Sequence, residues 1–308
     1  MELDEAKEIS GSTQMLIESL LADWPEHRAF LEKSFKSHPD EHIEILSQLA
    51  TDIALLCENN PKELIEGYRW MCDSFTTEEL YFRREGSYRC KTVAQAIEET
   101  YSNNQIMKWY MDGLLLSQLM WSNHAHAYIW FLENFITLLP NNYNYLEIGC
   151  GHGLYITQAA RDPKSKSLTG WDISEKSIEK TRNSLEVFNA IENVTLQQRD
   201  IFADNTDGNY DALVLSEILE HLEDPKAALK KLHNQLSTNG HLFVNVPLNS
   251  PAPDHIYLIR TIEEAVELVN ECGYKVLKSE GFPMTGYSLK RAQKADATIT
   301  CVIVAQKI

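Results

Sequence analysis

Three glycines alternate with other residues from Gly149 to Gly153, and an acidic residue, Glu147, precedes the first of them by two positions. Glycines let a backbone turn tightly and approach a ligand closely. A dinucleotide-binding turn has the spacing G-x-G-x-x-G, whereas this segment reads G-x-G-x-G. A carboxylate beside the turn disfavours a phosphate and favours a cation. The spacing therefore predicts a loop that binds a cationic ligand.

Two further acidic residues follow predicted strands. Asp172 ends the second predicted strand, nineteen residues after Gly153, where a carboxylate can accept hydrogen bonds from both hydroxyls of a ribose. Asp200 follows the third predicted strand, and an acid with a neighbouring backbone N–H can bind the edge of an adenine. Together with the glycine loop, these positions indicate a nucleoside-containing ligand.

A third group of reactive side chains follows the fourth predicted strand. If this segment is a helical turn, Glu217, Glu220 and His221 share one face of it. Two carboxylates and an imidazole in one place repel each other unless a proton or a cation joins them. His255, in the loop after the fifth predicted strand, should open on the same edge of the sheet. The four residues are predicted to bind one divalent cation, either Mg, Mn, Fe, Co or Zn.

Two other readings of this group stay open. His221 or His255 could act as a base without a metal. Alternatively, the segment could be purely structural, with the histidine packed beneath the ligand.

The order of these motifs resembles the class I S-adenosylmethionine-dependent methyltransferases over roughly residues 140–308. The resemblance implies an α/β, doubly wound Rossmann-like sheet of seven strands in the order 3-2-1-4-5-7-6. It also implies S-adenosylmethionine as the cofactor, with the glycines along its methionyl part, Asp172 at its ribose and Asp200 with Ile201 at its adenine. The residues then expected to bind the cofactor are Glu147, Gly149, Gly151, Gly153, Asp172, Ile173, Asp200, Ile201 and Ser216.

The E-x-x-E-H segment at residues 217–221, with a distant histidine, is similar to the metal-dependent 2′-O-methyltransferases that modify small-RNA ends. The segment alone also resembles the O-methyltransferases of ubiquinone biosynthesis. This second resemblance implies O-methylation assisted by a metal.

The elements that must position these residues change in pattern near Pro140. Residues 1–140 have helical periodicity and are predicted to form an all-α cap domain that selects the substrate, whereas residues 141–308 alternate strands with helices. The cap could supply one of His124 and His126 to the pocket, or Tyr110 or Tyr88 to the methionyl carboxylate. Strands are expected at Tyr143–Ile148, Ser167–Trp171, Val194–Gln198, Ala212–Ser216, His241–Val246, Tyr274–Gly281 and Thr298–Gln306, and helices between them at Leu154–Arg161, Glu175–Phe188, Pro225–Leu236 and Ile262–Glu271. The last two strands should be antiparallel neighbours, with no room for a crossover helix.

Composition limits the functions that fit this chain. The net charge of −17 over 308 residues repels polyphosphates, so a nucleic-acid substrate is not expected. The six cysteines form no C-x-x-C pair, no apolar run has the length of a membrane span, and the acidic N-terminus lacks the features of a signal peptide. We therefore expect a soluble cytoplasmic protein that does not bind membranes; a homo-oligomer is compatible with the sequence.

The combined prediction is a methyltransferase that uses S-adenosylmethionine on a small, natural-product-like acceptor, with O-methylation assisted by a divalent metal. The alternative is a metal-independent N-, C- or O-methyltransferase that acts on a free acceptor or on a carrier-tethered substrate docked by the helical domain. A domain that binds the cofactor without catalysis is the third reading, and the intact loop and acids argue against it.

Overall fold

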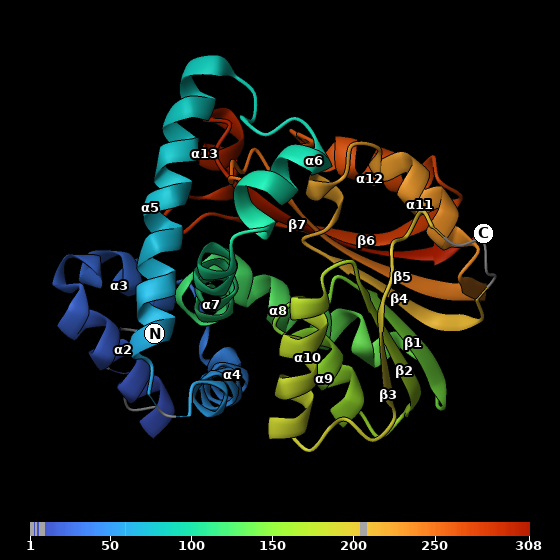
Figure 1. Cartoon of the computed structure of the whole chain (residues 1–308), viewed down its shortest axis with the longest axis horizontal. Coiled ribbons are helices and arrows are strands. Elements are labelled where there is room, and N and C mark those ends of the chain that lie inside the picture. The colour runs from blue at the N-terminus through green and yellow to red at the C-terminus, as the bar shows by residue number, and fades with distance from the viewer. Residues whose placement is uncertain (1–2, 4, 6–9, 59, 204–207) are drawn as a thin grey trace.

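The computed structural model describes Leu3, Glu5 and residues 10–58, 60–203 and 208–308. Most of the acidic N-terminus, and with it the start of the predicted cap domain, lies outside the described residues. The rest forms one seven-stranded sheet with helices on both faces and a group of N-terminal helices beyond one edge (Figure 1). No described helix combines the length and the apolar character that a membrane span requires.

The sheet has the strand order β3-β2-β1-β4-β5-β7-β6, which confirms the predicted topology. Neighbouring strands are parallel from β3 to β5, whereas β7 is antiparallel to both β5 and β6. The strands are β1 (Tyr143–Ile148), β2 (Ser165–Asp172), β3 (Val194–Gln198), β4 (Tyr210–Ser216), β5 (Leu236–Leu248), β6 (Tyr274–Pro283) and β7 (Ile299–Lys307).

The two faces of the sheet bury separate apolar clusters because successive side chains of a strand point to opposite faces. In β4, Ala212 and Val214 join one cluster, whereas Leu213 and Leu215 join the other. Helices α9 and α10 lie on the first face, and α11 and α12 lie on the second (Figure 1). Their bounds are α9 (Leu154–Arg161), α10 (Glu175–Val187), α11 (Pro225–His233) and α12 (Ile262–Asn270).

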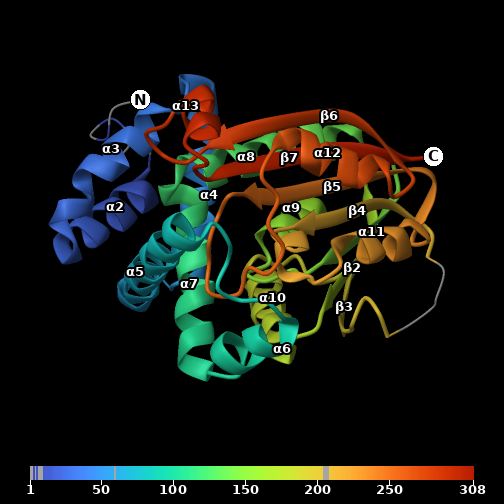
Figure 2. The ribbon, with the colours of Figure 1, turned by 90° about the horizontal axis from the view of Figure 1, so that it is seen from above.

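The region before the sheet is helical, as predicted. Its helices are α2 (Gly11–Asp23), α3 (Arg28–Lys36), α4 (Ile43–Leu56), α5 (Lys62–Glu85), α6 (Val93–Ala96), α7 (Asn104–Met120) and α8 (Ser122–Asn134). Short turns interrupt or follow them at η1 (Pro25–His27), η2 (Asp40–His42), η3 (Ile97–Tyr101), η4 (Ile136–Leu138) and, after β4, η5 (Leu219–His221). In Figure 2 the arrowheads of β4 and β5 point toward α5 and α7, so these helices lie at the carboxyl edge of the sheet.

The apolar core of the helical region continues into the sheet. Phe131 of α8 is fully buried and contacts Tyr155 of α9 and Phe243 of β5, with ring centroids 4.8 Å and 5.0 Å away. Asp52 of α4 is also fully buried, and both its oxygens accept hydrogen bonds from Arg161 of α9, at 2.5 Å and 3.0 Å. The boundary at residue 140 stays a prediction, but no break in the core accompanies it among the described residues.

Several strands and helices differ from their predicted bounds by a few residues, and four elements differ more clearly. Helix α2, capped by the hydroxyl of Ser10, was not expected, and a short helix α13 (Leu289–Lys294) lies between β6 and β7 without crossing the sheet. The sequence pattern predicts one helix from Asn123 to Leu139, ended by Pro140, but α8 ends at Asn134 and the separate turn η4 follows it. Strand β5 begins at Leu236, which the pattern placed in a helix, because Leu236 pairs with Tyr210 of β4 before the register shifts. Long-range pairing therefore determines this boundary.

Candidate active site

A cavity of about 730 Å³ lies between the carboxyl ends of the central strands and the N-terminal helices. Its walls include the loop after β1, the ends of β2 and β4, and the loop after β5. The opposite wall comes from the helical region and includes the aromatic residues Trp24, Phe30, Phe75, Tyr110 and Trp121. Its volume is in the range of cavities that bind small molecules, and its walls are mostly apolar with a few polar groups at one end.

The glycine loop forms one end of this cavity. Gly149, Gly151 and Gly153 all have positive φ, at 71°, 51° and 78°, which residues with a side chain rarely adopt. A Cβ atom on Gly149 would lie 2.0 Å from Cδ1 of Ile218, so that side chain would have to move. Hydroxyl groups of α10 support the loop, since Thr181 donates a hydrogen bond to the carbonyl of Gly151.

The predicted cofactor residues lie around the same cavity, with one exception. Gly153 does not line it but begins α9, packed against Thr181 and Ser184. Asp172 is largely buried, and its Oδ1 accepts a hydrogen bond from the N–H of Ser174 at 2.8 Å. Asp200 is exposed, and its Oδ1 accepts from the N–H of Phe202 at 2.8 Å. Lining residues also include Glu147, Gly149, Gly151, Ile173, Ile201 and Ser216.

The carboxyl groups of the loop and the second strand have shifted pKa values. Burial raises the pKa of Glu147 to about 8, against the opposing effect of a hydrogen bond that it accepts from the hydroxyl of Tyr145 at 2.6 Å. Burial raises the pKa of Asp172 to about 6. A cation near Glu147 would favour its ionised form, which the protein alone disfavours.

The second reactive group stands beside the loop. Each of Glu220, His221 and His255 offers one atom that could bind a metal ion. These three atoms lie within 4.8 Å of one another. His221 and His255 line the cavity, and Glu220 is fully buried behind them. Both carboxylate oxygens of Glu220 lack a hydrogen-bond partner among the described residues, although Oε1 lies 3.7 Å from Nε2 of His221. Burial and the neighbouring carboxyl of Glu217 raise the pKa of Glu220.

Glu217 differs from its predicted position. The helical turn η5 begins only at Leu219, and Glu217 has a φ of 56°, in the left-handed region that costs a side-chain-bearing residue about 1–2 kcal/mol. Its N–H still bonds to the carbonyl of Asn245 in β5, because the chain has not yet left the sheet. Glu217 lines the cavity with Oε1 unpartnered, but it is not one of the three residues whose ligand atoms converge. The predicted shared helix face with Glu220 and His221 is therefore wrong.

The tautomers of both histidines follow from their neighbours. Nδ1 of His255 lies 2.6 Å from the carbonyl oxygen of Ser250, and Nδ1 of His221 lies 3.2 Å from that of Asp254. A carbonyl oxygen only accepts, so each Nδ1 carries a proton, and in the neutral imidazole the lone pair is then on Nε2. Burial lowers the pKa of His255 to about 4, so this imidazole is neutral near pH 7. Two Nε2 atoms are thus able to bind a metal ion or accept a proton.

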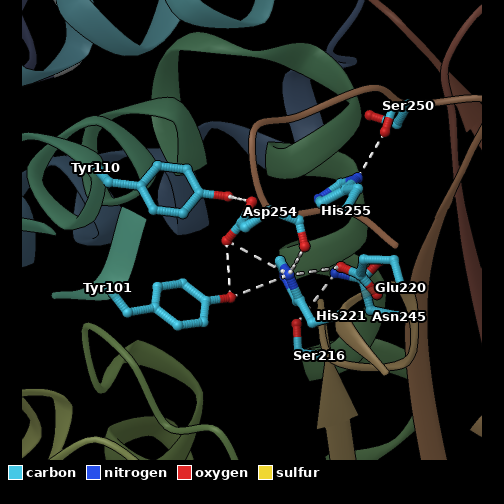
Figure 3. A network of polar contacts seen from close by, with 9 residues as sticks. All are labelled: Tyr101, Tyr110, Ser216, Glu220, His221, Asn245, Ser250, Asp254 and His255. Carbon is cyan, nitrogen blue, oxygen red and sulfur yellow. Dashed lines mark hydrogen bonds and ion pairs between the residues drawn. The ribbon is translucent and has the colours of Figure 1, made fainter. Parts of the chain in front are cut away.

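Asp254 connects this group to the helical region (Figure 3). It is buried, and its two carboxylate oxygens accept hydrogen bonds from Tyr101 and Tyr110, each at 2.9 Å. Its Oδ2 also lies 3.4 Å from Nδ1 of His221. Tyr101 ends the π-helical turn η3, and π turns occur often at functional sites. Asp254 therefore holds His221 in a fixed orientation from the side of the helical region.

A profile of the methyltransferase-domain family matches residues 120–295, which is more than half of the chain. The chain belongs to this methyltransferase family. The matched segment begins at the end of α7 and so includes α8 as well as the sheet.

Curated relatives carry the same type of domain. A ubiquinone biosynthesis O-methyltransferase of Vibrio parahaemolyticus is 27% identical over 127 residues, which are 41% of this chain and 52% of that protein. The enzyme of the same name from Alkalilimnicola ehrlichii is 28% identical over 127 residues, covering 40% of this chain and 49% of that protein. The match spans about half the length of these relatives.

A solved structure shows the same fold. The N-methyltransferase NodS from Bradyrhizobium japonicum, in complex with S-adenosyl-L-homocysteine, aligns with a TM-score of 0.51 at 19% identity and covers 70% of this chain and 99% of that one. The predicted methyltransferase fold is confirmed. The residues around the cavity fit S-adenosylmethionine: the two glycines Gly149 and Gly151 of positive φ, a buried acid at the β1 end, and carboxylates at the end of β2 and after β3.

Sequence reasoning missed part of the site. Asp254 and Tyr101 meet only because η3 packs against the loop after β5, and no local motif marks either of them. Of the cap residues considered, His124 does line the cavity, with its Nδ1 2.9 Å from the hydroxyl of Ser117. Tyr110 also lines it but donates to Asp254, and the hydroxyl of Tyr88 accepts from the N–H of Ser250. These two hydroxyls therefore fix the loop after β5.

Asp172 provides a test of the cofactor assignment. Asp172→Asn should weaken binding of S-adenosyl-L-homocysteine about 10- to 100-fold, because the charge-assisted hydrogen bonds to a ribose are worth about 1.5–3 kcal/mol. In the parent protein, affinity should also fall as the pH drops through about 6, since protonation of Asp172 removes the charged acceptor. Calorimetry at several pH values should show less of this fall in Asp172→Asn. Unchanged affinity in the variant would contradict the assignment.

Proposed function

We propose that this protein is an S-adenosylmethionine-dependent methyltransferase that methylates a hydroxyl group of a small acceptor with the help of a divalent cation. The observation that carries the proposal is the position of Glu220, His221 and His255 beside the glycine loop, with His221 and His255 on the wall of the same cavity. O-methylation is also the activity in the names of the curated relatives.

The chain fits such a cation. Glu220 is a buried carboxyl with two unpartnered oxygens, and two imidazoles beside it keep an Nε2 lone pair. Burying a carboxylate without a partner is costly, and a divalent cation would remove that cost. Glu220, His221 and His255 would hold the ion, with Glu217 as a fourth candidate at the cavity wall. An ion there would lower the pKa of an acceptor hydroxyl.

The residues around the cavity have separate tasks in this reaction. S-adenosylmethionine supplies a methyl group already activated on a sulfonium. The glycine loop, Asp172 and Asp200 orient the cofactor, so that the acceptor can approach in line. The aromatic wall from the helical region excludes water and binds an apolar acceptor. With three or four protein ligands, an ion held there would have positions open for acceptor oxygens, which would suit a catechol or a vicinal hydroxy-carbonyl compound.

A second candidate is methyl transfer with a histidine as the base. The specific observation in its favour is that His221 and His255 both line the cavity with Nδ1 held by a backbone carbonyl, which leaves Nε2 of the neutral imidazole as the proton acceptor. In this case the raised pKa of Glu220 favours its neutral carboxyl. The acceptor atom could then be nitrogen, carbon or oxygen. The acceptor could be free or tethered to a carrier that docks on the helical region.

A transfer assay tests the main proposal. Purified protein is incubated with methyl-labelled S-adenosylmethionine, a divalent metal and matched phenolic acceptors with one hydroxyl or two adjacent hydroxyls. We expect label to enter the adjacent dihydroxy compounds preferentially, because only they can chelate. Equal transfer to both series, independent of metal, would favour the histidine-base alternative. Binding of the cofactor without transfer to any tested acceptor would leave only a cofactor-binding domain.

Asp254 should act as a positioning residue for His221. Asp254→Asn is expected to lower kcat about 10- to 100-fold, the usual size for residues that orient a ligand histidine, while KM for the cofactor stays close to the parent value. Tyr110→Phe removes one hydrogen bond to the same carboxylate without touching His221, and it should change kcat far less. Steady-state kinetics of both variants compares the two effects. An equal loss in both would indicate that packing, rather than the orientation of His221, is responsible.

A further inference from the structure

Three histidines form a second cluster outside the cavity. His38 follows α3, His42 ends the turn η2, and His126 lies in α8. One ring nitrogen of each lies within 4.8 Å of the others. The ring centroids are 4.2 Å apart for His38 and His126, 5.9 Å for His38 and His42, and 5.7 Å for His42 and His126. None of the three lines the cavity described above.

Protonation of these three histidines is unfavourable. Protonated imidazoles at these distances would repel each other, and no carboxylate belongs to the group that converges here. Burial, with the neighbouring histidines, lowers the pKa of His38 to about 2 and that of His126 to about 4. His38 and His126 are therefore neutral near pH 7, the form in which histidine binds metals.

Packing alone does not explain the arrangement. Nδ1 of His42 is buried and has no hydrogen-bond partner among the described residues, which is unusual for a buried polar atom. Nε2 of His126 lies 3.3 Å from the hydroxyl of Ser37, and that hydroxyl already donates to the carbonyl of Ser34 at 2.6 Å, so it can only accept from Nε2. A cation would satisfy these nitrogens.

We propose that His38, His42 and His126 bind one divalent transition-metal ion at a site separate from the cavity. Three imidazoles and no carboxylate favour Zn, Cu, Ni or Co over Mg and Ca, which require oxygen ligands. His42 and His126 are partly exposed, so the ion can enter from solvent and keep water at the remaining position.

This site would connect distant parts of the chain. His126 stacks on Phe282 of β6, with centroids 5.4 Å apart, whereas His38 and His42 lie in the connection between α3 and α4. A bound ion would therefore join the first helices of the chain to the helix that packs on the sheet. Because the native state would bind the ion and the unfolded chain would not hold the preformed site, binding should raise the melting temperature.

The experiment separates this site from the group in the cavity. Full-length protein without a polyhistidine tag is cleared of metal with a chelator and titrated with Co²⁺, whose absorption spectrum reports nitrogen ligands. The background carries His221→Ala and His255→Ala, so that cavity binding is removed. We expect one Co²⁺ per chain in this background and a higher melting temperature with Zn²⁺.

Adding His42→Asn to that background should lower Co²⁺ affinity at least about tenfold. Loss of a residue that orients a metal ligand already costs about that much, and loss of the ligand itself should cost no less. His241→Asn, a change at a histidine outside both groups, should leave affinity unchanged. Circular dichroism verifies folding, and His126→Asn repeats the test if His42→Asn does not fold. The proposal is overturned if the background binds no Co²⁺, or if folded His42→Asn and His126→Asn both bind it as tightly as the background does.

Discussion

His221→Ala, or removal of divalent metal with a chelator, should lower methyl transfer about 100-fold or more while the affinity for S-adenosyl-L-homocysteine changes less than about twofold. The reason is the separation of tasks within the cavity. We propose that the glycine loop, Asp172 and Asp200 bind the cofactor, whereas His221 lies in η5 after β4. Initial rates and calorimetry on the same protein samples measure the two effects.

His255→Ala should behave like His221→Ala, because both imidazoles present Nε2 beside Glu220. His241→Ala is the matched control, since this half-buried histidine of β5 does not line the cavity. Full activity in excess chelator, with no metal found by elemental analysis, would reject the cation. If His221→Ala were inactive under those conditions, the histidine would be the base.

The sequence predicted the parts of the site that depend on local pattern. Glu147, Asp172 and Asp200 were found because strands and helices alternate regularly, and in a parallel sheet the ends of successive strands meet at one edge. The strand order was also predicted, because the motifs resemble those of a family whose sheet has that order. Local pattern did not reveal Tyr101, whose position depends on the packing of η3 against a loop more than a hundred residues later in the chain.

Glu217 shows a second limit of such reasoning. Its spacing from Glu220 and His221 fits a helical face, but β-pairing continues through its backbone N–H and delays the turn by two residues. The resulting left-handed conformation is a strained backbone at the cavity wall, of the kind often retained for function. Helical periodicity alone does not reveal where a strand ends.

The contact between the helical region and the sheet predicts the largest effect on stability. Phe131→Ala should lower the free energy of unfolding by about 3–5 kcal/mol, the usual cost of emptying a buried aromatic position. Phe131 is fully buried and its ring packs against Phe135, Tyr155 and Phe243, so the space that it leaves cannot easily collapse. Denaturant unfolding, followed by circular dichroism, measures the change.

Leu80→Ala is the control, since this side chain of α5 is 69% exposed and its loss should cost less than about 0.5 kcal/mol. The same unfolding curves test whether the core is continuous. Five of the six tryptophans lie before the sheet and the sixth, Trp171, lies in β2, so tryptophan fluorescence reports mainly on the helical region. Phe131→Ala weakens the contact of that region with the sheet. If both parts share one core, tryptophan fluorescence and circular dichroism should shift together in the variant. The midpoint for the helical region could instead stay unchanged while the midpoint for the sheet falls. The two parts would then unfold independently, and the helical region would be a separate domain over the cavity.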